Sequence, residues 1–364
     1  MGNEKPASPR SAYSDFLATK TFGSLDGLRA VAILAVIWHH YGQTIPGLAI
    51  TTRGYLGVDL FFILSGFLIV TLLLRERRRC GSIWLQGFYV RRFLRIFPPY
   101  YLMLSIVLAT AFLKPGHNSI AIRHDFPFAA LYLSNLVPMN SLLAISWSLS
   151  AEEQFYLVVP TLEKYARPLL PFLLPGAYIV VALPTFGLFP QLDLPIFFRG
   201  TTFGPILLGA MMAHVLDCQR GFGSVYRVLS LRFMPILMLA LIFLITSQAG
   251  DDLSGWPRSA IHWTMLALVA CCVINEENIL RPILSLWPIR RIGIVSYGIY
   301  LYHLIIGHYI LKGLEVGAVP WNFAPFLCTA LATWVVAECS YRYVETPFLA
   351  AKARFAQRRQ TLDE

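Results

Sequence analysis

The stretch LDGLRAVAILAVIWHH, Leu25 to His40, decides the fold, because it is an apolar helix with an arginine near its start and two histidines at its end. Ionisable side chains inside a membrane span are costly and are usually functional. An α-helix places Arg29 and His40 on one face, about 16 Å apart along its axis, whereas His39 points about 100° away. The pattern predicts a membrane helix in which Arg29 and His40 belong to a functional site.

The composition extends this prediction to the whole chain. The 364 residues are 56% hydrophobic and 14% charged, which is typical of a multi-pass membrane protein and excludes an ordinary soluble domain. The 30 Lys and Arg against 20 Asp and Glu are a surplus that membrane proteins carry in cytoplasmic loops, so we expect no nucleic-acid partner. The six cysteines lack the spacing of a metal site, and we expect no metal.

Apolar runs long enough to cross a bilayer recur along the chain, and the positive-inside rule predicts which of their connecting loops are cytoplasmic. Cytoplasmic termini place 24 of the 30 basic residues inside, provided that residues 127–163 make one net crossing. We therefore expect an all-α bundle of ten transmembrane helices, with residues 127–145 broken, re-entrant or interfacial. The nine clear runs are 29–47, 57–74, 97–113, 169–189, 200–217, 233–249, 260–275, 293–312 and 321–341.

Seven arginines lie between Arg75 and Arg95, on the side predicted to be cytoplasmic. Arg75 to Arg79 are typical of a topology signal that contacts anionic lipid headgroups. Arg92 and Arg95 share a helical face directly before Pro98 and Pro99, where we expect the helix to break. That geometry suits binding of ligand phosphates, and we assign Arg91, Arg92 and Arg95 to a donor site.

The stretch GYLGVDLFFILSGFLI, Gly54 to Ile69, opens the next span. Gly57 and Gly66 predict close helix packing, and Asp59 predicts either an interfacial carboxylate or one paired with a cation.

The stretch SWSLSAEEQFY, Ser146 to Tyr156, places Glu152 and Glu153 at the start of a crossing. Serine caps and acidic residues at a helix start would be purely structural. Alternatively, one carboxylate faces a cavity, where it orients a histidine or binds an acceptor hydroxyl. No motif for a serine nucleophile surrounds the serines.

The stretch SYGIYLYHLIIGHY, Ser296 to Tyr309, buries hydroxyls and imidazoles in an apolar helix. Tyr297, Tyr300 and His303 lie along one side, which we place toward the same cavity as His40. His308 is expected to be a packing residue. In YRYVETPF, Tyr341 to Phe348, Arg342 and Glu345 have the spacing of a simple ion pair.

These blocks, together with RRFLRIFPPYY, resemble the membrane acyltransferase-3 family, which contains bacterial O-acetyltransferases of surface glycans, Nod-factor-type glycolipids and macrolides. The resemblance covers nearly all of the chain after residue 23. It implies a ten-helix bundle with an Arg-x10-His pair, matched by Arg29 and His40, and a cytoplasmic Arg-x-x-Arg, matched by Arg92 and Arg95. It also implies acyl transfer from cytoplasmic acyl-CoA, with acetyl-CoA as the expected donor, to a hydroxyl beyond the membrane.

The residues and the resemblance together predict a mechanism. His40 acts as general base or as transient acyl carrier, and the sequence leaves both open. Glu152 or Glu153 fixes the imidazole tautomer, Tyr300 or His303 steadies the oxyanion, and Arg29 either holds the donor or pairs with Asp26. A small lipophilic acceptor such as a macrolide, a proton-coupled transporter and a non-catalytic scaffold are the alternatives.

The expected organisation is a cytoplasmic tail over residues 1–22, a membrane acyltransferase domain over 23–348 and a second cytoplasmic tail over 349–364. The first 22 residues lack the continuous apolar run of a signal peptide. The expected location is the bacterial inner membrane, with membrane lipid and a glycan or glycolipid as partners.

Overall fold

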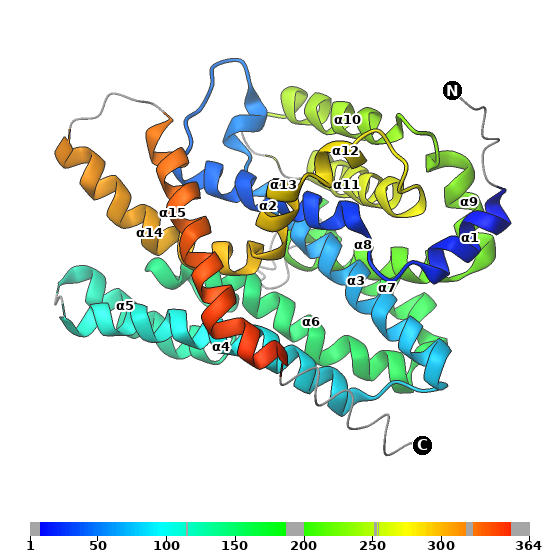
Figure 1. Cartoon of the computed structure of the whole chain (residues 1–364), viewed down its shortest axis with the longest axis horizontal. Coiled ribbons are helices and arrows are strands. Elements are labelled where there is room, and N and C mark those ends of the chain that lie inside the picture. Colours follow the sequence, from blue (N-terminus) through cyan, green and yellow to red (C-terminus); the bar gives the residue numbers. More distant parts are fainter. Residues whose placement is uncertain are drawn as a thin grey trace.

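The computed structural model describes residues 8–113, 116–186, 200–250, 253, 255–317 and 323–350, and the regular elements in these ranges are all helices (Figure 1). The predicted all-α class is therefore confirmed. The α-helices are α1 (Pro9–Ala18), α2 (Gly23–Tyr41), α3 (Leu56–Cys80), α4 (Leu85–Leu113), α5 (His117–Ala130), α6 (Ser146–Tyr165), α7 (Leu170–Ala182), α8 (Gly200–Asp217), α9 (Gln219–Leu229), α10 (Met234–Gln248), α11 (Trp256–Ile274), α12 (Arg281–Leu284), α13 (Trp287–Ile294), α14 (Ser296–Gly317) and α15 (Ala324–Ser340).

Several of these helices have the length and composition of a membrane span. In the described ranges, α3, α4 and α11 qualify alone, and counting each sharply bent helix pair as one span raises the number to seven. The expected count of ten and the orientation of the termini are not established by this. Many of the predicted apolar runs fold as helices that are short or joined at sharp bends, such as the 76° bend between α13 and α14.

Helix α3 lies at the centre of the bundle, against α2, α6, α8 and α11. Glycines bring the backbones together: a Cβ atom at Gly66 would collide with the carbonyl oxygen of Ile206 on α8, and one at Gly57 with that of Ala32 on α2. The predicted role of these two glycines in close packing is confirmed.

Helix α4 runs without a break through Pro98 and Pro99, so the expectation of a break there is wrong. The two prolines cannot donate the backbone hydrogen bonds that an ideal helix would give to Leu94 and Arg95. A membrane span tolerates this loss because neighbouring helices can supply hydrogen-bond partners for the freed carbonyl groups. Tyr297 of α14 supports the region by donating a hydrogen bond to the carbonyl oxygen of Ile96, at 3.0 Å.

The predicted irregular stretch before α6 is confirmed in its backbone. Helix α5 ends at Ala130, and Tyr132 adopts a left-handed conformation with φ 54°. The buried carboxylate of Asp125 accepts the backbone N–H groups of Asn140 and Ser141, at 2.9 and 3.0 Å. The backbone N–H groups of Asn140 and Ser141 are thus satisfied by protein, as irregular backbone inside a membrane requires.

Helix α1 lies within the segment expected to be a tail, and it packs on α9. Its buried Ala12 and Phe16 form the contact face, and Tyr13 donates a hydrogen bond to the carbonyl oxygen of Asp217, at 2.6 Å. Residues 9–18 are therefore a docked helix.

Candidate active site

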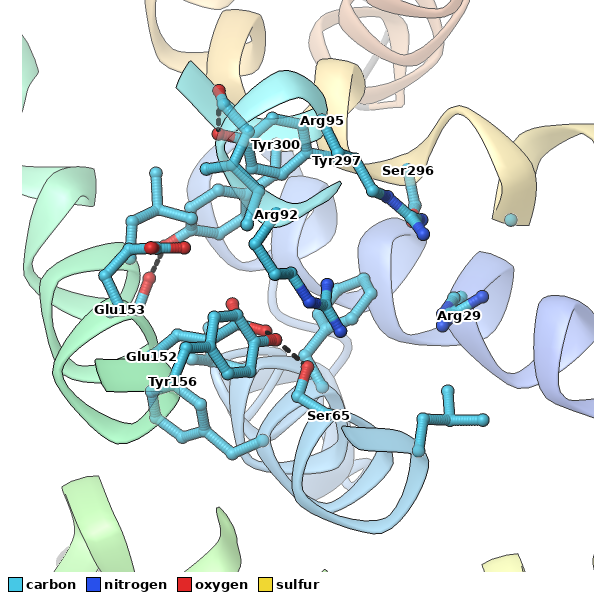
Figure 2. A pocket seen from close by; sticks show the side chains of 18 of the residues that line it. Arg29, Ser65, Arg92, Arg95, Glu152, Glu153, Tyr156, Ser296, Tyr297 and Tyr300 are labelled. Carbon is cyan, nitrogen blue, oxygen red and sulfur yellow. Dashed lines mark hydrogen bonds between the residues drawn. The ribbon is translucent and has the colours of Figure 1, made fainter. Parts of the chain in front are cut away.

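A cavity of about 290 Å³ lies among α2, α3, α4, α6 and the junction of α13 with α14, and we call it the inner cavity (Figure 2). Its polar lining joins residues as far apart in sequence as Arg29 and Tyr300, and its apolar walls are mostly phenylalanine, leucine and isoleucine side chains. The polar lining residues are Arg29, Ser65, Arg92, Arg95, Ser148, Glu152, Glu153, Tyr156, Ser296, Tyr297 and Tyr300.

A second cavity of about 550 Å³ lies at the end of α3 that carries Arg79, and we call it the basic cavity. Leu72, Arg92 and Arg95 line both cavities, so the two adjoin at these residues. Arg91 lines only the basic cavity and forms an ion pair with Glu76, at 2.9 Å. The structure thus brings the three predicted donor-site arginines together, with Arg92 and Arg95 at the boundary.

Arg92 and Arg95 have no hydrogen-bond or ion-pair partner among the described residues. The guanidinium of Arg92 lies over the ring of Tyr156, at 4.5 Å from its centroid. The side chains of Arg92 and Arg95 both line the inner cavity (Figure 2). Arg29 lies nearby in the same view and pairs with Asp26, at 2.9 Å. Arg29 thus pairs with Asp26, as one expectation has it, and its place in the cavity lining also allows it to hold the donor, as the other has it.

Glu152 and Glu153 both line the inner cavity, on the α6 side. The carboxylate of Glu152 accepts hydrogen bonds from the hydroxyls of Ser65 and Tyr156. Glu153 has no hydrogen-bond partner within the described part of the chain. Sequence reasoning does not single out Ser65 or Tyr156 as site residues. The hydroxyl of Ser65 lies inside an apolar span, and such a position indicates a functional residue.

Tyr300 forms a second group of hydrogen bonds in the lining of the inner cavity. Its hydroxyl lies 2.6 Å from that of Ser148 and donates to the carbonyl oxygen of Ile145, at 3.1 Å. One turn farther along α14, the buried His303 donates from Nδ1 to the carbonyl oxygen of Tyr300, at 2.7 Å. Nε2 of His303 has no partner among the described residues, so a lone pair is left unused in the protein interior.

His40 lies at the end of α2, outside the lining of the inner cavity, with its ring centroid 5.1 Å from that of His303. Its Nδ1 is 2.9 Å from the carbonyl oxygen of Val36. A carbonyl only accepts, so Nδ1 carries the proton and Nε2 presents a lone pair. The tautomer is thus fixed by the backbone, whereas the sequence assigned this role to Glu152 or Glu153, which lie in the inner cavity instead.

Two of the sequence alternatives are resolved elsewhere in the bundle. Asp59 is buried and paired with Arg258 and His262, at 2.9 and 3.0 Å. Arg342 and Glu345 form no ion pair in the described structure, and Glu345 is buried in the short π-helix Tyr341–Glu345.

Comparison with known proteins gives one family. A family model described as an acyltransferase domain matches residues 22–339, nearly all of the predicted membrane domain. Peptidoglycan O-acetyltransferase OatA of Listeria monocytogenes is 28% identical over 349 residues, which cover 89% of this chain and 55% of the relative. O-acetyltransferase OatA of Staphylococcus aureus is 28% identical over 353 residues, with 89% and 56% covered.

A Staphylococcus aureus (strain COL) protein named "Putative O-acetyltransferase SACOL0978" is 28% identical over 367 residues, 92% of this chain and 58% of the relative. The chain thus spans a little over half the length of the curated relatives that it matches. No solved structure matches it.

Proposed function

Because the chain belongs to the acyltransferase-3 family, as predicted from its motifs, we propose that it is a membrane O-acyltransferase. In this proposal an acyl group, acetyl in the simplest case, moves from acyl-CoA in the cytoplasm to a hydroxyl of a glycan or glycolipid beyond the inner membrane of a bacterium. The observation that carries the proposal is the junction of the basic and inner cavities at Arg92 and Arg95.

Arg92 and Arg95 are cations inside a helix bundle without carboxylate partners among the described residues. Glu152 and Glu153 line the same cavity without an ion pair to either arginine, and Arg95 is exposed, so the guanidinium N–H groups remain available to a bound anion. Guanidinium groups bind phosphate oxygens through paired hydrogen bonds, and coenzyme A carries phosphates at one end and its thioester at the other. Phosphates at Arg92 and Arg95 would let the acyl-bearing arm extend into the inner cavity.

The inner cavity suits this arm because apolar side chains such as Phe61 and Phe62 form its walls, while polar groups are grouped along α6 and α14. In this proposal the arm extends from Arg92 to Tyr300, which lines the same cavity. His303 and His40 follow beyond Tyr300. Chemistry at His40 therefore requires the thioester to pass Tyr300 and His303.

The tautomer of His40 suits it to either predicted role, because Nε2 presents its lone pair. As general base, Nε2 takes the proton of the acceptor hydroxyl while the hydroxyl oxygen attacks the thioester carbonyl and the carbon–sulfur bond breaks. As acyl carrier, Nε2 attacks the carbonyl carbon and the carbon–sulfur bond breaks; the acceptor hydroxyl oxygen then attacks the same carbon, the carbon–nitrogen bond breaks, and the hydroxyl proton balances the thiolate. In both cases coenzyme A leaves as the thiol once its sulfur is protonated.

The relatives support the choice of a glycan as acceptor. The Listeria monocytogenes relative is named for peptidoglycan, and this name supports a glycan acceptor over a small lipophilic molecule. Family membership also favours an enzyme over a transporter or a scaffold, since the family is described by acyl transfer.

The test is donor turnover combined with acceptor analysis. Membranes that contain the wild-type protein are expected to release coenzyme A from acetyl-CoA, and mass spectrometry of surface glycans is expected to show added acetyl groups only when the protein is present. His40→Ala is expected to abolish both signals. Equal coenzyme A release by wild type and His40→Ala, with unchanged glycans, would refute the proposal.

A further inference from the structure

The basic cavity is strongly asymmetric in charge. Six cationic side chains and one carboxylate line it: Lys20, Arg75, Arg79, Arg91, Arg92, Arg95 and Glu76. Such a surplus attracts an anionic ligand that carries more than one charge. Only those cations that the protein does not already engage are available to such a ligand.

Two of the cations are already engaged. The carboxylate of Glu76 is bound by Arg91, at 2.9 Å, and it also accepts the backbone N–H of Trp84, at 2.8 Å. Arg75 donates to the carbonyl oxygen of Phe16, at 3.1 Å, and lies over the ring of Phe22, at 5.0 Å. Arg75 and Arg91 are therefore used in holding the cavity walls together.

The other four cations have no hydrogen-bond or ion-pair partner among the described residues, and they form two pairs by position. Arg92 and Arg95 lie where the basic cavity meets the inner cavity. Lys20 and Arg79 line only the basic cavity. Lys20 belongs to the link between α1 and α2, and Arg79 to the last turn of α3.

The docking of α1 explains how Lys20 reaches this cavity. Arg75 holds the carbonyl of Phe16, and Tyr13 holds that of Asp217 at the end of α8. Arg78 fixes the same Asp217 through an ion pair, at 2.5 Å. These contacts anchor α1 next to the last turn of α3, so the residue that follows α1 is delivered to the basic cavity.

We propose that Lys20 and Arg79 form a second phosphate subsite, which binds the phosphate on the ribose of the coenzyme A donor. Arg92 and Arg95 bind the diphosphate. This assignment rests on the proposed function and adds a donor specificity to it. It makes the protein selective for donors that carry the ribose phosphate.

The order of groups along coenzyme A supports the assignment of the two pairs. The diphosphate lies between the acyl-bearing arm and the adenosine, and the ribose phosphate lies on the adenosine side. With the arm in the inner cavity, the diphosphate falls at the shared boundary, and the adenosine with its phosphate stays in the basic cavity. The two available pairs of cations thus occur in the order in which the donor presents its two phosphate groups.

The experiment compares acetyl-CoA with 3′-dephospho-acetyl-CoA as donor for the full-length protein in membranes. Charge-assisted hydrogen bonds to a phosphate are expected to give wild type a KM about 10- to 100-fold lower for acetyl-CoA. The double variant Lys20→Ala with Arg79→Ala is expected to lose this preference, because its KM rises for acetyl-CoA alone. Arg92→Ala with Arg95→Ala is expected to raise KM for both donors.

Arg77→Ala is the matched control, because Arg77 lies two residues before Arg79 on α3 but donates to the carbonyl oxygen of Glu163 and lines neither cavity. It is expected to keep the wild-type preference. Lys20→Ala alone guards against misfolding of the double variant, since Lys20 is exposed and lies outside the helices, and it is expected to lower the preference.

A wild type that uses both donors equally well would overturn the assignment, and so would an equal rise of both KM values in the Lys20 and Arg79 variants. Failure of wild type with both donors would overturn the proposed function itself, and the subsite with it.

Discussion

Two groups of charged side chains lie inside this bundle, and they differ in how the charges are satisfied. In the first, Asp59 on α3 binds Arg258 and His262 on α11, at 2.9 and 3.0 Å, and Arg258 also lies over the ring of Tyr55, at 4.9 Å. In the second, around the inner cavity, Arg92 and Arg95 lack such partners among the described residues.

The two groups therefore have different roles. A buried carboxylate bound by an arginine and a histidine of one neighbouring helix fixes the position of α3 against α11, and both of its oxygens are already engaged. Cations that line a cavity without forming an ion pair, as Arg92 and Arg95 do among the described residues, add little to helix packing, but they remain available to an anion. We therefore expect changes in the first group to affect stability and changes in the second to affect binding and catalysis.

The largest expected effect on catalysis is that of His40→Ala. Loss of a general base or acyl carrier is expected to lower the rate of acyl transfer by about 10²- to 10⁴-fold, measured as acceptor acetylation per folded protein. His39→Ala is the matched control, because His39 is also exposed at the end of α2 and its ring contacts Tyr55 and His40 but not His303. Similar losses in both variants would show that the end of α2, and not His40, matters.

The next effect is on stability. Asp59→Ala leaves Arg258 as an uncompensated charge and His262 without the carboxylate that it contacts, which is expected to cost about 3–5 kcal/mol in the free energy of unfolding. Thermal unfolding of the purified protein measures this loss, and acyl transfer per folded molecule is expected to stay within about threefold of wild type. An unchanged unfolding temperature with lost activity would place Asp59 in the functional group.

The smallest effect is a change in thiol reactivity. Cys80 is exposed and lines the basic cavity, whereas Cys218 is exposed in the nearby turn between α8 and α9. The backbone N–H groups of Gly221 and Arg220 lower the pKa of the Cys218 thiol, so it reacts readily and serves as control. Coenzyme A at ten times its Kd is expected to slow maleimide labelling of Cys80 about tenfold, without an effect on Cys218. Protection of both thiols or of neither would contradict a donor site in the basic cavity.

Much of the fold and of the candidate site is readable from local sequence. The apolar runs predict helices because backbone groups in lipid must be satisfied within a segment. The polar residues that interrupt these runs predict the inner cavity: Arg29, Arg92, Arg95, Glu152, Glu153, Tyr297 and Tyr300 all line it. The roles of these residues stay predictions.

What the sequence could not supply depends on contacts between distant segments. Asp59 finds its partners about 200 residues later, and no local pattern specifies that pairing. Ser65 is fixed by Glu152, 87 residues away, for the same reason. Helix α4 continues through Pro98 and Pro99, where local propensity alone indicates a break.

The tautomer of His40 shows a further limit. Its proton is placed by the carbonyl of Val36, one turn earlier on the same helix. Side-chain patterns do not reveal such a backbone contact, so the sequence points to a glutamate instead. The number of membrane-spanning helices is also hard to predict from the sequence, because bends such as the one between α13 and α14 do not follow from hydropathy.

The measurement that tests the contrast between the two groups most directly is equilibrium binding of coenzyme A to purified wild type, to Arg92→Ala with Arg95→Ala, and to Asp59→Asn. The account predicts that loss of the two arginines raises Kd about 100-fold, since each charge-assisted contact contributes about tenfold, while Asp59→Asn binds within about threefold of wild type despite its lower stability. Equal binding by wild type and the arginine variant, or loss of binding in Asp59→Asn alone, would contradict it.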